Sequence, residues 1–309
     1  ASPVSAGMEV PVKRRRSITS YYKSEEREAL VLILPLVLLL AVFIAYPVAS
    51  NFYYGFTRWK GFGEPSWVGL ANFSRMFEDQ MFGQAMRNTF ILVLYIPLGT
   101  LVPLIVSAML REGMRGWAVF KAVLYIPNVL GYVIVGMMFS VILRENGAVN
   151  EILRGIGLDW MAIGWLSSSQ SAIHVIGVLN GVWARIGFGC IFFLAAMSSI
   201  DSQLYDAAKI DGAGWWRTFF SVTVPSIRFA IEFWIVLQFI SVFARMFGFI
   251  YTLTGGGPGF ATTTLEFGIY IKGFSNFQMG YASAWAMLLF FFCAIIAVAQ
   301  IYVLRRRGE

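Results

Sequence analysis

The stretch DAAKIDGAGWWRTFFSVTVP, residues 206–225, is a polar and turn-like segment in a chain that otherwise consists largely of long apolar runs. Its first residues are good helix formers, Asp211-Gly212-Ala213-Gly214 interrupt them, and an apolar periodicity resumes at Trp215 and continues until Pro225. The pattern predicts a short helix, a tight turn and a second short helix. Gly212 can adopt a positive φ at no steric cost, and its missing side chain lets another surface approach the turn closely.

The segment has an apolar face and a polar one. Trp215, Phe219 and Val222 follow one another at i, i+4 and i+7, so they share a face that we expect to pack against membrane helices. Asp206 and Asp211 then face outward. An ordinary amphipathic loop helix that lies on a bilayer surface would show the same pattern, so the residue types alone leave both interpretations open.

The apolar runs on either side of this segment identify the class of protein. The chain has 309 residues, of which 58% are hydrophobic and 13% are charged, far more apolar than an ordinary soluble domain. A helix needs roughly 20 apolar residues to cross the hydrocarbon core. Six stretches reach that length: Ala29–Ser50, Asn88–Leu110, Lys121–Leu143, Ser171–Met197, Ile227–Thr254 and Tyr281–Leu304. We expect an all-α, polytopic membrane protein with six transmembrane helices.

The spans divide the chain into regions. A tail of residues 1–28 precedes a transmembrane domain of residues 29–304, and residues 305–309 form a second tail. The loop between the fourth and fifth spans, residues 198–227, contains the quoted stretch.

The distribution of Lys and Arg predicts the orientation of the chain. Fifteen of them lie in the two tails and in the loops on the same side, against seven in the other loops, while Arg185 and Arg245 lie within spans. Short basic loops stay in the cytoplasm, so we expect both termini and the loop of residues 198–227 to be cytoplasmic. The net charge of +7 is therefore a topology signal, and we expect no nucleic-acid partner.

The sequence lacks the patterns typical of catalysis or metal binding. Cys190 and Cys293 lie inside predicted spans and His174 is the only histidine, so we expect neither a disulfide framework nor a metal site. The run Gly255-Gly256-Gly257-Pro258-Gly259 lacks the Gly-Lys-Ser/Thr ending of a phosphate-binding loop and predicts a turn. A nucleophile elbow and a paired-carboxylate site are also missing. We expect no catalytic residue, no bound cofactor and no enzymatic activity in this chain.

The quoted stretch resembles the cytoplasmic signature of the inner-membrane permeases of binding-protein-dependent ABC importers. That signature reads Glu-Ala-Ala, three residues, Gly, nine residues, then Ile-x-Leu-Pro. Here it stands as Asp206-Ala207-Ala208, Gly212 and Val222-Thr223-Val224-Pro225, with identical spacing. Asp replaces Glu, and Val replaces both Ile and Leu; the shorter acid puts in doubt the strength of a contact with a cation on the ATPase.

In that family the element is a coupling helix that inserts into a groove of the nucleotide-binding subunit. The resemblance therefore implies that closure of the ATPase is transmitted through this loop. The residues to which it assigns coupling are Asp206, Ala207, Ala208, Asp211, Gly212, Ala213 and Pro225.

Further motifs extend the resemblance over roughly residues 30–304. Trp67-Val68-Gly69-Leu70, Leu253-Thr254-Gly255-Gly256-Gly257-Pro258 and Met279-Gly280-Tyr281-Ala282-Ser283-Ala284 are similar to sugar permeases of the maltose type, specifically the first permease. Where that family has Phe-Asp before the Gly-rich turn, this chain has Phe247-Gly248, so the role of that acid is lost or moved.

The resemblance implies an ATP-driven saccharide importer of the type I fold in the bacterial inner membrane. It also implies several partners. They are a second homologous permease chain, two ATPase subunits that bind ATP and Mg, and an extracytoplasmic solute-binding protein that delivers the saccharide.

Polar and aromatic residues inside the spans are candidates for the substrate path. An ionisable side chain at membrane depth costs on the order of 2.5 kcal/mol or more, so Arg185 and Arg245 are expected to be functional or paired. Aromatic rings stack on sugar faces, and amides hydrogen-bond sugar hydroxyls. The candidates are Asn180, Trp183, Arg185, Gln238, Ser241, Arg245, Tyr251 and Trp285.

The two arginines also suggest the charge of the substrate. In a water-filled cavity they would suit carboxylate or phosphate groups, which predicts an anionic saccharide or sugar derivative, such as a uronate oligosaccharide or a glycerol phosphate. The alternative is that both arginines snorkel or bond to backbone carbonyls. An ion-gradient-driven secondary transporter of sugars is the alternative function, although no carboxylate falls at the centre of a predicted span.

Overall fold

The computed structural model describes residues 31–113 and 117–306. The predicted N-terminal tail, residues 1–28, lies outside these ranges, as do residues 307–309 of the predicted C-terminal tail. The chain divides into two compact units, residues 1–50 and residues 51–309.

The described part of the first unit is helical. Val31–Gly55 is one helix, long and apolar enough to cross a membrane, and it continues into the second unit. A π-helical segment, η1 (Ala41–Ala45), interrupts its regular hydrogen bonding, and its last part is α2 (Tyr46–Gly55). The predicted first span therefore runs beyond its expected end at Ser50.

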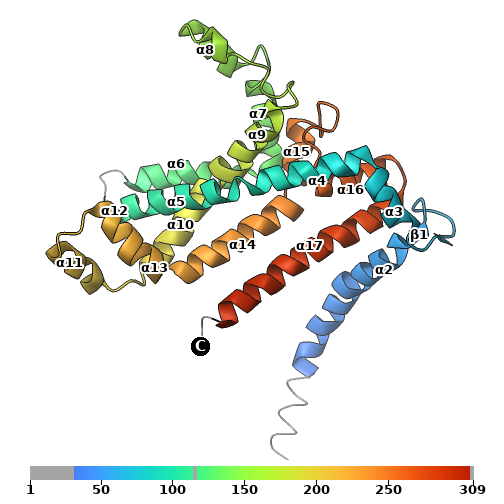
Figure 1. The fold of residues 1–309 in the computed structure, drawn as a ribbon, viewed down its shortest axis with the longest axis horizontal. Coiled ribbons are helices and arrows are strands. Elements are labelled where there is room, and N and C mark those ends of the chain that lie inside the picture. The colour runs from blue at the N-terminus through green and yellow to red at the C-terminus, as the bar shows by residue number, and fades with distance from the viewer. Residues whose placement is uncertain (1–30, 114–116, 307–309) are drawn as a thin grey trace, which may run out of the picture. The chain divides into compact units, whose positions relative to one another are not determined.

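The second unit contains the other long apolar helices (Figure 1). In chain order these helices are α4 (Gln80–Val93), α5 (Ile96–Arg111), α6 (Trp117–Leu130), α7 (Tyr132–Ile142), α9 (Ser171–Ile176), the π-helical η3 (Gly177–Trp183), α10 (Ala184–Met197), α14 (Arg228–Ala244) and α17 (Met279–Arg306). The bilayer explains the large apolar side chains that α6, α7 and α17 expose.

Shorter elements connect these helices. The connections that follow the first, third and fifth spans contain β1 (Thr57–Arg58), β2 (Ser66–Trp67), α3 (Ala71–Glu78), α8 (Ala148–Gly155), the 3₁₀-helical η2 (Asp159–Met161), α15 (Phe247–Leu253), α16 (Leu265–Tyr270) and the π-helical η5 (Ile271–Ser275). The loop between the fourth and fifth spans holds α11 (Ser202–Ile210), α12 (Trp215–Thr218), the π-helical η4 (Phe219–Thr223) and α13 (Val224–Ser226). β1 and β2 form an antiparallel pair, Thr57 opposite Trp67.

The prediction of six membrane-spanning helices is confirmed when two bent helices are each counted as one span. Within the described residues four helices are long and apolar enough by themselves, and two further pairs qualify together. The fourth span, Ser171–Met197, has the predicted bounds. The second is longer than predicted, Gln80–Arg111. The third is bent by 101° at Gly131, whose φ of 73° only glycine adopts without strain.

The predicted fifth span, Ile227–Thr254, is wrong at its outer end. α14 ends at Ala244, and the chain starts a separate helix, α15, at Phe247. The prediction that Pro225 ends the preceding helix is also wrong, because the helical stretch Trp215–Ser226 continues through Pro225 to Ser226. The chain instead bends by 77° at Ile227, between the helical stretch Trp215–Ser226 and α14.

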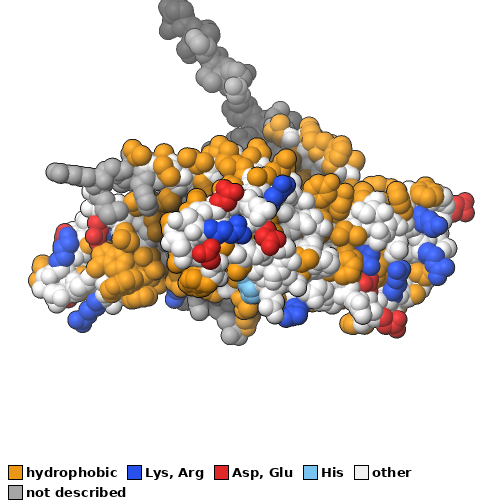
Figure 2. Space-filling view, turned by 90° about the horizontal axis from the view of Figure 1, so that it is seen from above, with side chains coloured by type: hydrophobic (Ala, Val, Ile, Leu, Met, Phe, Trp, Pro, Cys, Tyr) orange, Lys and Arg blue, Asp and Glu red, His pale blue; other side chains and the backbone are white. Residues whose placement is uncertain are grey.

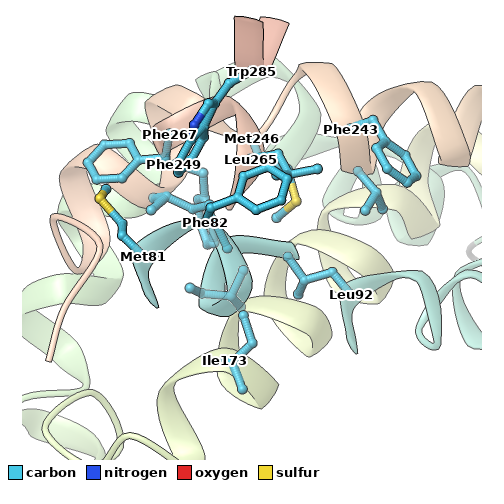
Figure 3. Packing of buried hydrophobic residues seen from close by; sticks show 14 of the residues in the cluster. Met81, Phe82, Leu92, Ile173, Phe243, Met246, Phe249, Leu265, Phe267 and Trp285 are labelled. Atoms are coloured by element: carbon cyan, nitrogen blue, oxygen red, sulfur yellow. The ribbon is translucent and has the colours of Figure 1, made fainter. Parts of the chain in front are cut away.

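The main hydrophobic core joins α4, α9, α14, α15, α16 and α17. Trp285 of α17 is fully buried in it, and the ring of Phe82 meets the indole edge-on at 4.9 Å between centroids (Figure 3). Gly268 lets α16 approach this ring, because a Cβ there would overlap the Trp285 indole. A second core cluster joins α5, α10 and α14 to the loop of residues 198–227.

Candidate functional site

The loop of residues 198–227 contains the predicted helix, turn and helix, which we call the coupling segment, residues 202–226. Asp201 caps α11 by accepting a hydrogen bond from the Gln203 N–H at 2.9 Å. At the other end the Ala213 N–H donates to the Ala208 carbonyl and the Gly212 N–H to that of Lys209, at 2.9 and 3.0 Å. This is the Schellman pattern, and Gly212 takes its left-handed position with φ of 68°, as predicted.

The polarity of the coupling segment is confirmed with one correction. Asp206 and Asp211 are exposed, Phe219 is buried and Trp215 is half-buried against the second core cluster. The third inward residue is Thr223 rather than Val222, because the π-helical η4 rotates the following residues relative to a regular α-helix. The Thr223 hydroxyl lies 3.0 Å from that of Tyr205 and joins the two short helices.

Arg111, at the end of α5, fixes the coupling segment to the membrane helices. Its guanidinium carbon lies 3.7 Å from the centre of the Tyr205 ring, a cation–π contact. A cavity of about 610 Å³ lies between α5, α10 and the coupling segment, with Arg111, Glu112, Asp206, Lys209 and Trp215 among its lining residues. Arg111 and this cavity therefore place the coupling segment against α5 and α10.

The outward surface of the coupling segment is unusually apolar for a loop. Ile210 is 86% exposed, and Trp216, Phe220 and Leu204 are also exposed. Asp206 makes an exposed ion pair with Lys209 at 3.7 Å, which contributes little to stability and leaves the carboxylate accessible. Apolar side chains ringed by charges are typical of a protein-binding surface. Ala207, Ala208 and Ala213 add no bulk, and a Cβ at Gly212 would meet nothing.

Three of the eight predicted substrate-path residues come from η3 and α10. The Arg185 side chain is half-buried; its Nη2 and the Nδ2 of Asn180 are buried and have no hydrogen-bond partner among the described residues. The Arg185 guanidinium lies 5.7 Å from the ring centre of Tyr132 in α7. Trp183 is half-buried and meets the Phe139 ring edge-on. Buried donors without acceptors are costly, so these groups are poised to bind an acceptor.

The other five lie on α14, at its C-terminal end, on α15 and on α17. Ser241 is buried, and its hydroxyl has no partner in the described part of the chain, whereas Arg245 and Tyr251 are exposed at and after the break between α14 and α15. Gln238 and Trp285 serve packing in this conformation: Gln238 Nε2 donates to the Gly99 carbonyl at 3.1 Å, and Trp285 fills the main core.

The break in the fifth span is held by an acid that sequence reasoning did not single out. Oε2 of Glu266 accepts the N–H groups of Met246 and Phe247 at 2.8 and 3.0 Å. Burial raises the pKa of Glu266, and these two hydrogen bonds oppose the rise. A helix start beside a carboxylate is favourable, so Glu266 fixes where α15 begins.

A polar cavity of about 1250 Å³ was also not predicted. Gln80, Gln84, Arg87 and Asn88 of α4 line one wall, and residues 168–171, His174 and the loop after the Gly-rich turn line the others. Asn88 Nδ2 donates to the carbonyls of Phe260 and Thr263 at 2.9 and 2.8 Å, so it holds that loop in place. Neither Arg185 nor Arg245 lines this cavity.

A buried ion pair joins η5, just before the start of α17, to the start of α4. Lys272 Nζ lies 2.6 Å from Oδ2 of Asp79, which also accepts the Tyr281 hydroxyl at 2.9 Å. Oδ1 of Asp79 caps α4 through the Met81 N–H. Burial tends to raise the pKa of Asp79, but the hydrogen bonds from Lys272 and Tyr281, the Lys272 charge and the Met81 N–H outweigh it, so the pKa lies below its ordinary value of 3.8.

Comparison with known proteins identifies the family. Residues 68–307 match the family described as binding-protein-dependent transport system inner membrane component. This chain belongs to that family. The permease is 31% identical over 283 residues to the diacetylchitobiose uptake system permease protein NgcF of Streptomyces coelicolor, an alignment that covers 86% of this chain and 79% of the relative. It is 30% identical over 280 residues to the sn-glycerol-3-phosphate transport system permease protein UgpA of Yersinia pestis, covering 90% and 94%.

The fold of the permease also matches solved structures. A chain of a bacterial ABC transporter involved in the import of the acidic polysaccharide alginate superposes with a TM-score of 0.80 at 24% identity, covering 94% of this chain and all of that one. A second structure of an alginate ABC transporter, in complex with alginate pentasaccharide-bound periplasmic protein, gives 0.79 at 24% identity and covers 93% and 98%. The predicted family and the type I importer permease fold are confirmed, and the gradient-driven secondary transporter is not supported.

Proposed function

We propose that this permease forms half of the translocation pathway of an ATP-driven saccharide importer in the bacterial inner membrane. A second, similar permease completes the pathway, two ATPase subunits bind ATP and Mg, and an extracytoplasmic solute-binding protein delivers the substrate. Both termini and the coupling segment lie in the cytoplasm. Family membership and the names of the relatives support the importer and the saccharide class.

The coupling segment is the observation that carries this proposal. It exposes Ile210 and Trp216 beside the accessible carboxylates of Asp206 and Asp211, and Gly212 leaves the turn between its helices without a side chain. An ATPase groove with apolar walls and cationic edges would bury these two apolar side chains and form ion pairs with the two carboxylates. Closure of the ATPases would then move α5 and α14 and favour one access state over the other by differential affinity.

The substrate we propose is an anionic saccharide or sugar derivative. Arg185 supports it, because a guanidinium with a buried and unpaired nitrogen binds carboxylate or phosphate more strongly than a hydroxyl. Asn180, Trp183 and Ser241 would supply hydrogen bonds and a stacking face. Two relatives are named for the charged solutes sn-glycerol 3-phosphate and alginate. Gln238 and Trp285 are left out of this site because they serve packing.

The test is ATP hydrolysis by the purified complex with its binding protein and uronate or neutral oligosaccharides of equal length. We expect stimulation by the uronate set, and Arg185→Gln should weaken it about 10- to 100-fold, the range for a hydrogen bond to a charged group. Arg154→Gln, which changes an exposed arginine bonded to the Glu145 carbonyl, is the matched control. Stimulation by neutral sugars alone would overturn the anionic substrate, and absence of a co-purifying ATPase would overturn the importer.

A further inference from the structure

A third cavity, of about 650 Å³, lies between the β1–β2 hairpin, α3 and the start of α17. Three cations line it: Arg58, Lys60 and Arg75. All three are exposed, and none of them forms an ion pair with any residue that the structure describes. Arg75 lies over the Tyr281 ring, with its guanidinium carbon 4.3 Å from the ring centre. At the end of the molecule that carries α3, Lys and Arg side chains reach the surface with Asp and Glu side chains among them (Figure 2). The uncompensated charge attracts anions.

Aromatic side chains also line the cavity: Trp59, Phe62, Phe277 and Tyr281. Trp59 stacks on Tyr54 at 4.2 Å, and the rings of Phe62 and Phe277 face each other edge-on at 6.5 Å. Phe62 and Phe277 remain well exposed, and so does Trp67 on the same hairpin. Exposed aromatic rings beside cations are typical of the membrane–water interface, where one part of the side chain is apolar and the other meets headgroups.

The position of the cavity in the chain agrees with such an interface. The helix Val31–Gly55 ends three residues before Arg58, and the span Met279–Gln300 starts one residue after Gln278. Membrane helices end at the headgroup level, so the cavity lies where phosphates of the bilayer are found. This holds whichever side of the membrane the cavity faces.

One polar group in the cavity wall has no partner. Oε1 of Gln278 is buried and accepts no hydrogen bond from the described residues, although its backbone N–H donates to the Lys272 carbonyl at 2.8 Å. The preceding Phe277 has φ of 52°, a conformation that bulky residues rarely adopt. The strained turn holds both side chains at the cavity, where the unpaired acceptor is available to a hydroxyl or ammonium group of a ligand.

We propose that this cavity binds the headgroup of an anionic phospholipid. Arg58, Lys60 and Arg75 hold the phosphate, the aromatic rings contact the glycerol and the first methylenes, and Gln278 accepts a hydrogen bond from a headgroup hydroxyl. The proposal goes beyond the transport of saccharides and does not depend on which solute is carried. A phosphatidylglycerol headgroup supplies both the phosphate and the hydroxyl.

The first experiment is native mass spectrometry of the whole complex, purified in detergent and mixed with dioleoyl phosphatidylglycerol, dioleoyl phosphatidylcholine or free glycerol phosphate. We expect retained phosphatidylglycerol, and roughly tenfold less retention in Arg58→Gln/Arg75→Gln, because charge-assisted bonds to the phosphate are lost. Arg144→Gln/Arg154→Gln changes two exposed arginines outside the cavity and should retain the lipid as the wild type does. Equal retention in all three proteins overturns the proposal.

The second experiment tests the unpaired acceptor. Phosphatidylmethanol has the same phosphate charge as phosphatidylglycerol but lacks the headgroup hydroxyls. The wild type should prefer phosphatidylglycerol about fivefold, the worth of one hydrogen bond, and Gln278→Leu should bind the two lipids equally. Competition by free glycerol phosphate as strong as that by the lipid would assign the cavity to a soluble phosphate compound instead. A loss of binding-protein affinity in Arg58→Gln/Arg75→Gln with unchanged lipid retention would assign it to protein docking.

Discussion

Replacement of Lys272 by methionine should destabilise the permease strongly, because it leaves Asp79 charged and without its cation. The side chains of Lys272 and Asp79 are only 11% and 13% exposed, and their charged atoms lie 2.6 Å apart. Loss of one partner of a buried pair costs 3–5 kcal/mol, and the remaining exposure places this pair at the low end, about 3 kcal/mol. Methionine has a similar length, so packing changes little.

The assay is the unfolding midpoint of the reconstituted complex at one heating rate. A loss of about 3 kcal/mol corresponds to a midpoint lower by roughly 5–10 °C in a domain of this size. Lys209→Met is the matched control, because its pair with Asp206 is 3.7 Å long and its side chains are 77% and 67% exposed. We expect that control to lose less than about 1 kcal/mol.

A second substitution separates the ion pair from the other bonds of Asp79. Asp79→Asn removes the negative charge, keeps one oxygen to accept the Met81 N–H, and places its Nδ2 where it can donate to the Tyr281 hydroxyl oxygen. Added to Lys272→Met, it should restore part of the lost stability, since no unpaired charge remains buried. If the two losses simply add, or if Lys272→Met behaves like Lys209→Met, the reasoning is wrong.

Three further predictions concern the coupling segment, the break in the fifth span and the packing of α17. Gly212→Val should abolish co-purification of the ATPase but leave membrane insertion intact, whereas Gly214→Val, at φ of −69° and equally open, should keep the ATPase; the reverse result would contradict docking at the turn. Glu266→Leu should cost roughly 2–4 kcal/mol in a melting assay, since two N–H groups lose their acceptor. Because the pKa of Glu266 is raised, wild-type stability should fall as pH rises above the ordinary value of 4.5, and Glu266→Gln should remove that fall; a pH profile identical to wild type would refute the assignment. Gly280→Ala should lower the stability by about 1–3 kcal/mol, because a Cβ there overlaps the Thr57 carbonyl. The control Gly83→Ala, in open space on α4, should be neutral or stabilising by up to about 1 kcal/mol. Equal melting temperatures of the two variants would refute the close approach of Gly280 to Thr57.

Local patterns in the sequence were sufficient to predict the spans and the coupling segment. Hydropathy gave the fourth span with its bounds, because its ends coincide with polar turns on both sides. The Gly212 conformation followed from residue type alone, since helices commonly end at a glycine in the left-handed conformation. These features depend on neighbours in the chain, which the sequence displays directly.

The features that were missed depend on residues far apart. Lys272 is one of the seven cations that the sequence places in the outer loops, yet it is buried against Asp79, which precedes it by 193 residues. The break after Ala244 falls at Arg245, inside a stretch that hydropathy assigns to one span, and the acid that holds it, Glu266, lies on a different helix. The bend at Gly131 had a visible signal in the glycine, but a lone glycine in a membrane helix is too common to predict an angle of 101°.

The bend at Ile227 also limits how this permease can be redesigned. Only that residue separates the helical stretch Trp215–Ser226 from α14, so we expect a movement of the first to be passed on to the second. A chimaera that exchanges residues 206–214 for those of another importer keeps Tyr205 and Thr223, and with them the bond between the short helices. A chimaera whose junction lies at Ile227 itself would separate the native coupling segment from α14. An importer in which this permease couples to only one chosen ATPase would therefore be built by changing the exposed surface of the coupling segment and keeping the bend at Ile227.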